Sequence, residues 1–150
     1  MRLKIRIAAL LLGLMGFVYA CDTFKDEAAP SSYTEVPKQL DGKWQLKTVK
    51  RNGTDITETM DFSQFRLILH KDSTYAMENY LPFLVKKNGT WKTDDPTYPF
   101  FLTFKEEGSE SEAKTEITYP IVDGKRHITL TISPGCVNNS YVYSFEKMDE

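Results

Sequence analysis

His127-Ile128-Thr129-Leu130-Thr131-Ile132 and Tyr141-Val142-Tyr143-Ser144-Phe145-Glu146 are the two stretches that decide the fold. In both, large apolar side chains occupy every second position, and most positions between them are polar. Successive side chains of a β-strand point to opposite faces, so a period of two predicts a strand with one buried face and one solvated face. Such strands pair into antiparallel sheets with one wet face.

The same alternation recurs through residues 40–150. Turn-forming pairs such as Asn52-Gly53 and Asn88-Gly89 separate the alternating stretches, because both residue types tolerate a positive φ. No window has the spacing of an amphipathic helix, and only residues 57–62 are expected to form a short turn. We therefore predict an all-β fold, an antiparallel up-and-down β-barrel of about eight strands, which has no exposed sheet edge. The expected strands span residues 43–50, 64–70, 74–80, 83–87, 90–93, 99–106, 113–120, 126–133 and 140–147, with 83–87 and 90–93 open to being one interrupted strand.

The first expected strand opens with a recognisable motif. Leu40-Asp41-Gly42-Lys43-Trp44 resembles the Gly-x-Trp opening of lipocalin-like domains, and Gly89-Thr90-Trp91 has the same spacing. In that family the glycine lets the chain turn into the first strand and the tryptophan plugs the closed end of the barrel. The resemblance therefore implies a structural plug at Gly42 and Trp44. Ligand-carrying lipocalins pair this tryptophan with an arginine of the last strand, where this chain has only Lys147.

The whole domain is similar to lipocalin-like lipoproteins of unknown function from Gram-negative envelopes. The resemblance implies a lipocalin-like barrel and an envelope location, and it implies no established activity. The expected interior is rich in aromatic residues, and an eight-stranded barrel has room either for its own side chains or for one small ligand. We therefore expect a filled barrel with a shallow pocket at its mouth. The matching stretches are residues 52–57, 60–63, 79–83, 88–91, 119–126 and 133–136.

Residues 1–20 have the three parts of a secretory signal peptide. A basic start is followed by an uncharged apolar run over residues 7–18 and by a small residue before Cys21. The run is shorter than the ~20 residues that a transmembrane helix needs. Residues 18–21, Val-Tyr-Ala-Cys, resemble the lipobox of bacterial lipoproteins, which implies cleavage before Cys21 and attachment of fatty acid such as palmitate to that residue. An ordinary secretory signal that ends near a cysteine is the alternative.

The remaining chain divides into two parts. Residues 21–39 read as the lipidated cysteine and a polar tether, since their composition cannot bury much apolar surface, and residues 40–150 read as the barrel domain. Lys25-Asp26-Glu27 resembles the short signals that send some lipoproteins to the cell surface. We expect a protein anchored by lipid to the outer membrane, with exposure at the cell surface left open.

Charge and cysteine content limit the possible partners. Cleavage would remove three basic residues and take the formal charge from −2 to −5. An acidic domain without a basic stripe argues against nucleic acid as a partner. Cys136 would be left as a lone cysteine, which is more often a small buried apolar residue than a reactive thiol.

Four residues are candidates for binding a ligand: Asn79, Tyr80, Phe83 and Tyr98. They fall in loops or at strand ends, where aromatic faces next to amide or carboxylate groups suit sugars or lipid-like molecules. The alternative is that these rings close the open end of the core, as small β-domains commonly do.

Catalytic and metal-binding candidates are sparse. His70 and His127 are far apart in sequence and point outward by parity, whereas a metal site needs three or four converging ligands. The acidic pairs Asp94-Asp95 and Glu106-Glu107 invite a glycosidase hypothesis, but neighbouring carboxylates on a strand point to opposite faces. We expect no catalytic residues, no metal and no cofactor.

The sequence leaves three functional hypotheses in different classes. The first is a membrane-anchored lipoprotein with a non-enzymatic binding or interaction domain, whose partner is a small hydrophobic molecule, a glycan or an envelope protein. The second is a structural accessory subunit of an outer-membrane protein complex that holds no small-molecule ligand. The third is a hydrolase, which would need two converging ionisable groups in a pocket.

Overall fold

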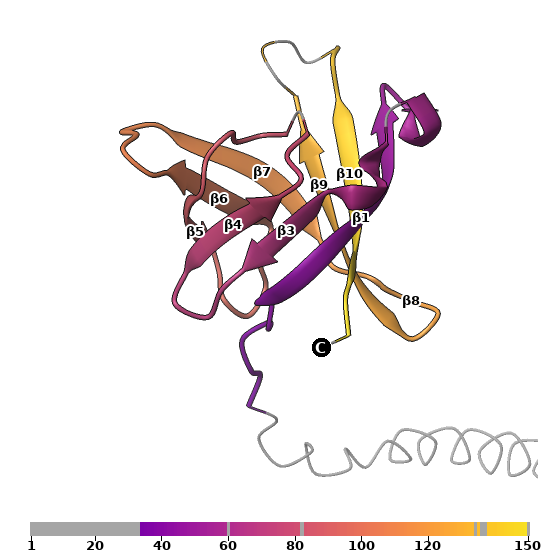
Figure 1. Cartoon of the computed structure of the whole chain (residues 1–150). Coiled ribbons are helices and arrows are strands. Elements are labelled where there is room, and N and C mark those ends of the chain that lie inside the picture. The colour runs from indigo at the N-terminus through magenta and orange to yellow at the C-terminus, as the bar shows by residue number, and fades with distance from the viewer. Residues whose placement is uncertain (1–33, 60, 82, 134, 136–137, 150) are drawn as a thin grey trace, which may run out of the picture. The chain divides into compact units, whose positions relative to one another are not determined.

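Eight antiparallel strands close into a barrel in the computed structural model (Figure 1). Residues 34–59, 61–81, 83–133, 135 and 138–149 are described, and the barrel belongs to the unit Val36–Glu150. The sequence-based predictions for the signal peptide, Cys21 and Cys136 concern residues outside these ranges. The wall is formed by β1 (Gly42–Arg51), β3 (Arg66–Leu69), β4 (Thr74–Glu78), β5 (Gly89–Thr93), β6 (Phe101–Glu106), β7 (Glu112–Thr118), β9 (Lys125–Ile132) and β10 (Tyr141–Lys147).

Each wall strand pairs with the next one along the chain, and the last strand closes the circle. β10 pairs with β9 on one side and with β1 on the other, and all pairings are antiparallel. The prediction of an all-β, antiparallel up-and-down barrel of about eight strands is therefore confirmed. Smaller elements decorate the connections: β2 (Thr54–Asp55) pairs with β1, β8 (Ile121–Val122) pairs with β9, and two short 3-10 helices follow at η1 (Thr57–Thr59) and η2 (Phe62–Gln64).

One expected strand is absent from the wall. Residues 83–87 were predicted to be extended and paired, but the described part of this segment forms no strand, and β4 and β5 pair only at Thr74–Thr90 and Tyr75–Gly89. Side chains take over the hydrogen bonds that a strand would make. The Asn88 Oδ1 accepts a hydrogen bond from the Met77 N–H at 3.1 Å, and the Tyr75 hydroxyl donates to the Lys87 carbonyl at 2.7 Å.

Alternation along the strands places the core inside the barrel. Along β9, for example, Ile128, Leu130 and Ile132 are buried, and the residues between them are only partly covered. The interior is occupied by side chains, as the aromatic content predicted. The largest fully buried ones include Trp44, Phe65, Leu67, Tyr75, Leu102, Phe104, Leu130 and Phe145.

The up-and-down order sorts the connections between two ends of the barrel. We call the end at which the chain begins β1 the N-terminal end, and the other the opposite end. The N-terminal end carries residues 36–41, 70–73, 94–100 and 119–124 and the segment after β10, whereas the opposite end carries residues 52–65, 79–88, 107–111 and 133–140. In Figure 1 the chain leading into β1 and the hairpin of β8 both lie at the lower side of the barrel.

Two buried tyrosines give the core a dependence on alkaline pH. Burial raises the pKa of Tyr75 and of Tyr143 from 10.0 to about 12. Below pH 10 both states of the protein keep these protons. Between pH 10 and 12 the unfolded chain releases them and the folded chain does not, so the free energy of unfolding should fall over that window. Urea unfolding across this range and the ultraviolet absorbance of tyrosinate will test this, with Tyr75→Phe and Tyr143→Phe each removing one late titration.

Candidate functional site

The four predicted ligand residues do not form one site. Asn79, Tyr80 and Phe83 lie in the β4–β5 connection at the opposite end, whereas Tyr98 lies in the β5–β6 connection at the N-terminal end. Successive connections of an up-and-down barrel lie at opposite ends, so this separation follows directly from the topology.

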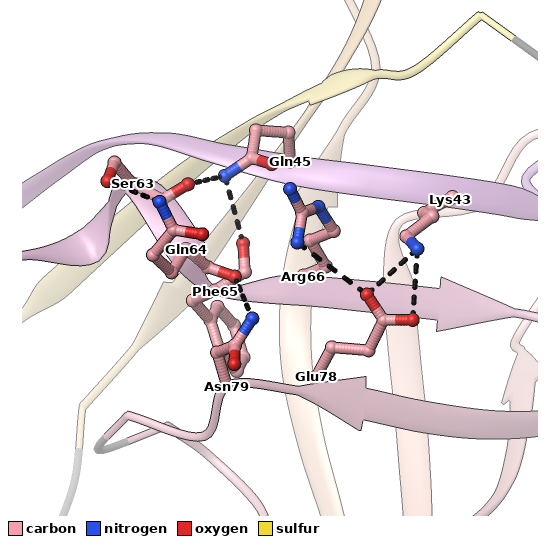
Figure 2. Close-up of polar contacts among 8 residues, drawn as sticks. All are labelled: Lys43, Gln45, Ser63, Gln64, Phe65, Arg66, Glu78 and Asn79. Carbon is pink, nitrogen blue, oxygen red and sulfur yellow. Dashed lines mark hydrogen bonds and ion pairs between the residues drawn. The ribbon is translucent and has the colours of Figure 1, made fainter.

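Asn79 holds the backbone in place (Figure 2). Its backbone has a positive φ of 51°, and its Nδ2 donates to the Gln64 carbonyl at 3.0 Å. The Gln45 side chain donates to the neighbouring carbonyls of Ser63 and Phe65. These bonds tie the end of β4 to the turn before β3 and occupy the amide that a ligand would need.

Phe83 fills the barrel from the opposite end. Its ring centroid lies 5.3 Å from that of Tyr143, 5.4 Å from Phe65 and 6.0 Å from Phe145, in tilted or edge-on arrangements that aromatic rings favour. The ring therefore occupies the space that a lipocalin calyx would offer to a ligand. Tyr80, on the same connection, is about half exposed.

The outer wall near Asn79 carries a small ion-pair cluster. Glu78 lies 2.8 Å from the Lys43 Nζ and 3.7 Å from the Arg66 guanidinium (Figure 2). The Glu78 carboxylate and the Lys43 ammonium both remain partly exposed. Exposed ion pairs of this kind contribute on the order of 0–1 kcal/mol to the free energy of unfolding. The cluster therefore links β1, β3 and β4 and offers no enclosed space for a ligand.

The histidines and acidic pairs lie apart from one another. His70 is exposed after β3, and His127 lies on β9, 3.7 Å from Glu146. Asp94 accepts hydrogen bonds from the Phe100 and Phe101 N–H groups, and these bonds lower the pKa of its carboxyl. Within the described part of the chain, no three histidine, cysteine, aspartate or glutamate side chains are grouped as metal ligands would be.

Trp44 lies at the N-terminal end, where its side chain is only 1% exposed. Its Nε1 donates to the Leu40 carbonyl at 2.9 Å, which fixes the chain before β1. The Lys147 ammonium lies 5.7 Å from the ring centroid and donates to the Asp41 carbonyl at 2.7 Å. Lys147 is therefore the cation of the last strand that lies over the Trp44 ring. Gly42, with φ 131°, leaves room for it, because a Cβ there would lie 2.6 Å from the Lys147 Cε.

A groove of about 530 Å³ lies beside Trp44. It runs between the segment that precedes β1 and the hairpin of β8, and its lining is mainly apolar. Lys38 lies at the edge of the groove. Its Nζ is 5.7 Å from the Tyr98 ring centroid and 5.8 Å from that of Tyr119. The Lys38 N–H also donates to the Pro96 carbonyl at 2.7 Å, so the segment is bound to the β5–β6 loop. Its lining includes Val36, Pro37, Leu40, Trp44, Tyr119 and Ile121.

Exposed apolar side chains are concentrated at the same end of the barrel as this groove, and two of them, Val36 and Ile121, line it. Of the seven large apolar side chains that are exposed in the described ranges, six lie at the N-terminal end and only Tyr80 lies at the opposite end. Exposure reaches 71% at Ile121 and 68% at Phe100. Exposed apolar side chains that cluster usually mark an interaction surface. Five of these six residues, all except Met148, form what we call the apolar rim: Val36, Tyr98, Phe100, Ile121 and Val122.

A larger hollow of about 900 Å³ follows the outer side of β1 and β10. Its lining is half polar, and three of its charged side chains form ion pairs with one another. Glu146 accepts a hydrogen bond from Lys125 at 3.0 Å and lies 3.4 Å from Lys47, and these cations lower the pKa of its carboxyl. The apolar rim and its groove are therefore the better candidate for a binding surface.

Sequence comparison places the domain among known families. A family model described as Domain of unknown function (DUF5004) matches residues 22–146. The chain belongs to the DUF5004 family. No curated protein and no solved structure matches the chain. The DUF5004 match spans the barrel and its upstream segment and, like the resemblance to lipocalin-like lipoproteins, carries no activity. In the described part of the DUF5004 chain, no helix has the length and apolarity to cross a bilayer.

Sequence reasoning missed most of the apolar rim of this DUF5004 chain. Tyr98 was the only rim residue among the candidates. The available signal was a break in alternation, since Ile121-Val122 places two apolar residues side by side just before the Asp123-Gly124 turn. A hairpin tip normally carries polar residues, so an apolar pair there marks a candidate interaction surface.

Proposed function

We propose that this chain is a lipid-anchored envelope lipoprotein whose barrel is a non-enzymatic binding module that acts through its N-terminal end. The observation that carries the proposal is the apolar rim, which gathers exposed side chains from three separate segments at one end of a barrel. The filled interior supports binding at the surface over binding in a calyx, because Phe83 and its neighbours occupy the centre.

The anchor rests on the sequence before the barrel. A signal-like segment ends at Cys21, and a lipobox-like Val18-Tyr19-Ala20 precedes it. An outer-membrane location with lipid on Cys21 agrees with this pattern. Two or more acyl chains hold a protein stably on a bilayer, whereas one chain binds only marginally.

The partner class is narrowed by the character of the surface. The groove and rim are lined mainly by apolar and aromatic side chains, which favours a hydrophobic partner over a glycan. An apolar patch on the outer wall of the barrel would favour a structural accessory subunit instead. Six of the seven exposed large apolar side chains of the described residues lie in the connections at one end of the barrel, so the binding module is the better proposal.

Replacing Cys21 with serine tests the anchor. We expect Cys21→Ser to lose metabolically incorporated fatty acid and to leave the membrane fraction or remain unprocessed, with an unchanged circular dichroism spectrum of the domain. Cys136→Ser is the matched control, because it removes the only other cysteine and should keep the fatty acid. Fatty acid that persists on Cys21→Ser would show that the anchor proposal is wrong.

A further inference from the structure

The apolar rim lies at the end of the barrel from which the chain runs back to Cys21. Fourteen residues, 22–35, separate that cysteine from Val36. Even fully extended, they span at most ~50 Å. A lipid on Cys21 would therefore hold the N-terminal end within that distance of the bilayer.

We propose that the apolar rim docks into the interface of the bilayer that carries the lipid anchor. This inference rests on the proposed lipidation and names the partner of the same surface. The side chains at the rim are those that favour the boundary between headgroups and acyl chains, with tyrosine beside aliphatic residues and phenylalanine. Docking directs the opposite end, with Tyr80 and the β6–β7 hairpin, away from the membrane.

The geometry of the rim suits shallow insertion. Val36, Phe100 and Ile121 are each about two-thirds exposed and come from three different segments. The Lys38 ammonium lies above the Tyr98 and Tyr119 rings, so its methylene chain covers apolar surface and its charge remains available to headgroups. Among the described residues of the opposite end, the hairpin tips at 52–55 and 107–111 are polar and mostly exposed, and Tyr80 is the one large apolar side chain that is exposed.

Charge does not drive this docking. The described charges at this end and on the adjoining strand ends nearly balance, with Lys38, Lys71, Lys125, Arg126 and Lys147 against Asp41, Asp72, Asp94, Asp95, Asp123 and Asp149. Asp95 is exposed and accepts hydrogen bonds from the Thr97 and Tyr98 N–H groups of its own loop. Binding should therefore occur on zwitterionic lipid and should not weaken in high salt, unlike attraction to anionic headgroups.

A covalent anchor makes a small surface sufficient. A handful of side chains on a free protein would bind a bilayer weakly. Once the chain is tied to the same bilayer, docking becomes intramolecular, and its effective concentration is set by the length of the connecting segment. The relevant experiment must therefore use the full, lipidated chain.

Fluorescence quenching on the lipidated chain tests the orientation. Ile121→Trp places a new tryptophan on the rim, and Glu110→Trp places one on the β6–β7 hairpin at the opposite end. Each variant and the parent are reconstituted in phosphatidylcholine vesicles that contain lipids with a nitroxide near the headgroup. We expect the added emission of Ile121→Trp to be quenched about twofold more than that of Glu110→Trp, because the rim lies within the boundary region.

Two further variants separate apolar insertion from proximity. Phe100→Ser combined with Val122→Ser, in the Ile121→Trp background, should reduce quenching to the level of Glu110→Trp. Tyr80→Ser in the same background is the matched control and should leave quenching unchanged. High salt and added anionic lipid should also have no effect.

The outcomes distinguish this inference from the proposed function. Mass spectrometry that finds lipid on the chain, together with equal quenching at both positions, would overturn the docking and leave the anchor standing. Quenching that requires anionic lipid, or a rim that is instead covered by a second copy in crosslinking, would also overturn it. A parent chain without lipid would overturn both.

Discussion

Trp44→Ala should lower the free energy of unfolding by about 3–5 kcal/mol, the usual cost of truncating a fully buried tryptophan. The side chain is 1% exposed, and its removal would leave a cavity at the N-terminal end of the barrel. The variant would also lose the hydrogen bond to the Leu40 carbonyl and the ring beneath the Lys147 ammonium. Equilibrium urea unfolding would measure the loss, which is a large share of the ~5–15 kcal/mol that stabilises a typical domain.

Trp91 provides the matched control for this substitution. It belongs to the second Gly-x-Trp sequence of the chain, but it is only partly buried, and its Nε1 donates to the His70 carbonyl at 3.2 Å. Trp91→Ala should therefore cost clearly less than Trp44→Ala. Equal losses would mean that Trp44 is not the plug. The stability loss of Trp44→Phe should fall between those of Trp44→Ala and Trp91→Ala. The phenylalanine keeps a ring in the core but loses one buried hydrogen bond, worth about 1 kcal/mol.

The wall of the barrel could be predicted because its signal is local. Side chains alternate within each strand, so Ile128, Leu130 and Ile132 show a buried face without reference to any other segment. Turn pairs such as Asn88-Gly89 mark where strands stop. All eight wall strands were found in this way, and their ends differ from the predicted ends by only a few residues.

The segment 83–87 was predicted wrongly because its signal is not local. The run from Leu81 to Val85 is apolar, which suits a strand, but the rings of Phe65 and Tyr143 offer Phe83 a place in the interior. Phe83 makes four ring contacts there, and the ladder between β4 and β5 is limited to two residue pairs. Competition of this kind between packing and pairing is decided by tertiary contacts that periodicity does not report.

The candidate site was harder to predict than the fold. Single loop aromatics were chosen by residue type, and the choice mixed the two ends of the barrel. The up-and-down order predicted from the same sequence already assigns successive connections to opposite ends, so Tyr98 could have been separated from Phe83. The apolar rim depends on three segments meeting around Lys38, and that meeting requires the folded structure.

Gly89→Ala should be the most disruptive change that adds a single carbon atom. A Cβ at this position would lie 2.0 Å from the Lys105 carbonyl oxygen and 2.9 Å from the Glu106 Cα. Both atoms belong to the backbone of β6, so no side-chain rotation relieves the contact. We expect a loss of about 3 kcal/mol or more, at the upper end of the cost of overpacking, measured by urea unfolding.

Gly53→Ala is the control that separates crowding from backbone preference. Gly53 has φ 81° and no atom within 4 Å of an added Cβ, so its substitution should cost only the strain of a positive φ, about 1 kcal/mol. If the two variants lose the same stability, close approach of β5 and β6 is not the reason for glycine at position 89. Hydrogen exchange adds a regional readout. Because β4 and β5 share only two residue pairs, Gly89→Ala should expose the amides of β5 first, whereas Gly53→Ala should leave them protected. The two Gly-x-Trp sequences then differ in which residue is indispensable: tryptophan in the first, which fills the barrel, and glycine in the second, which lets two strands approach.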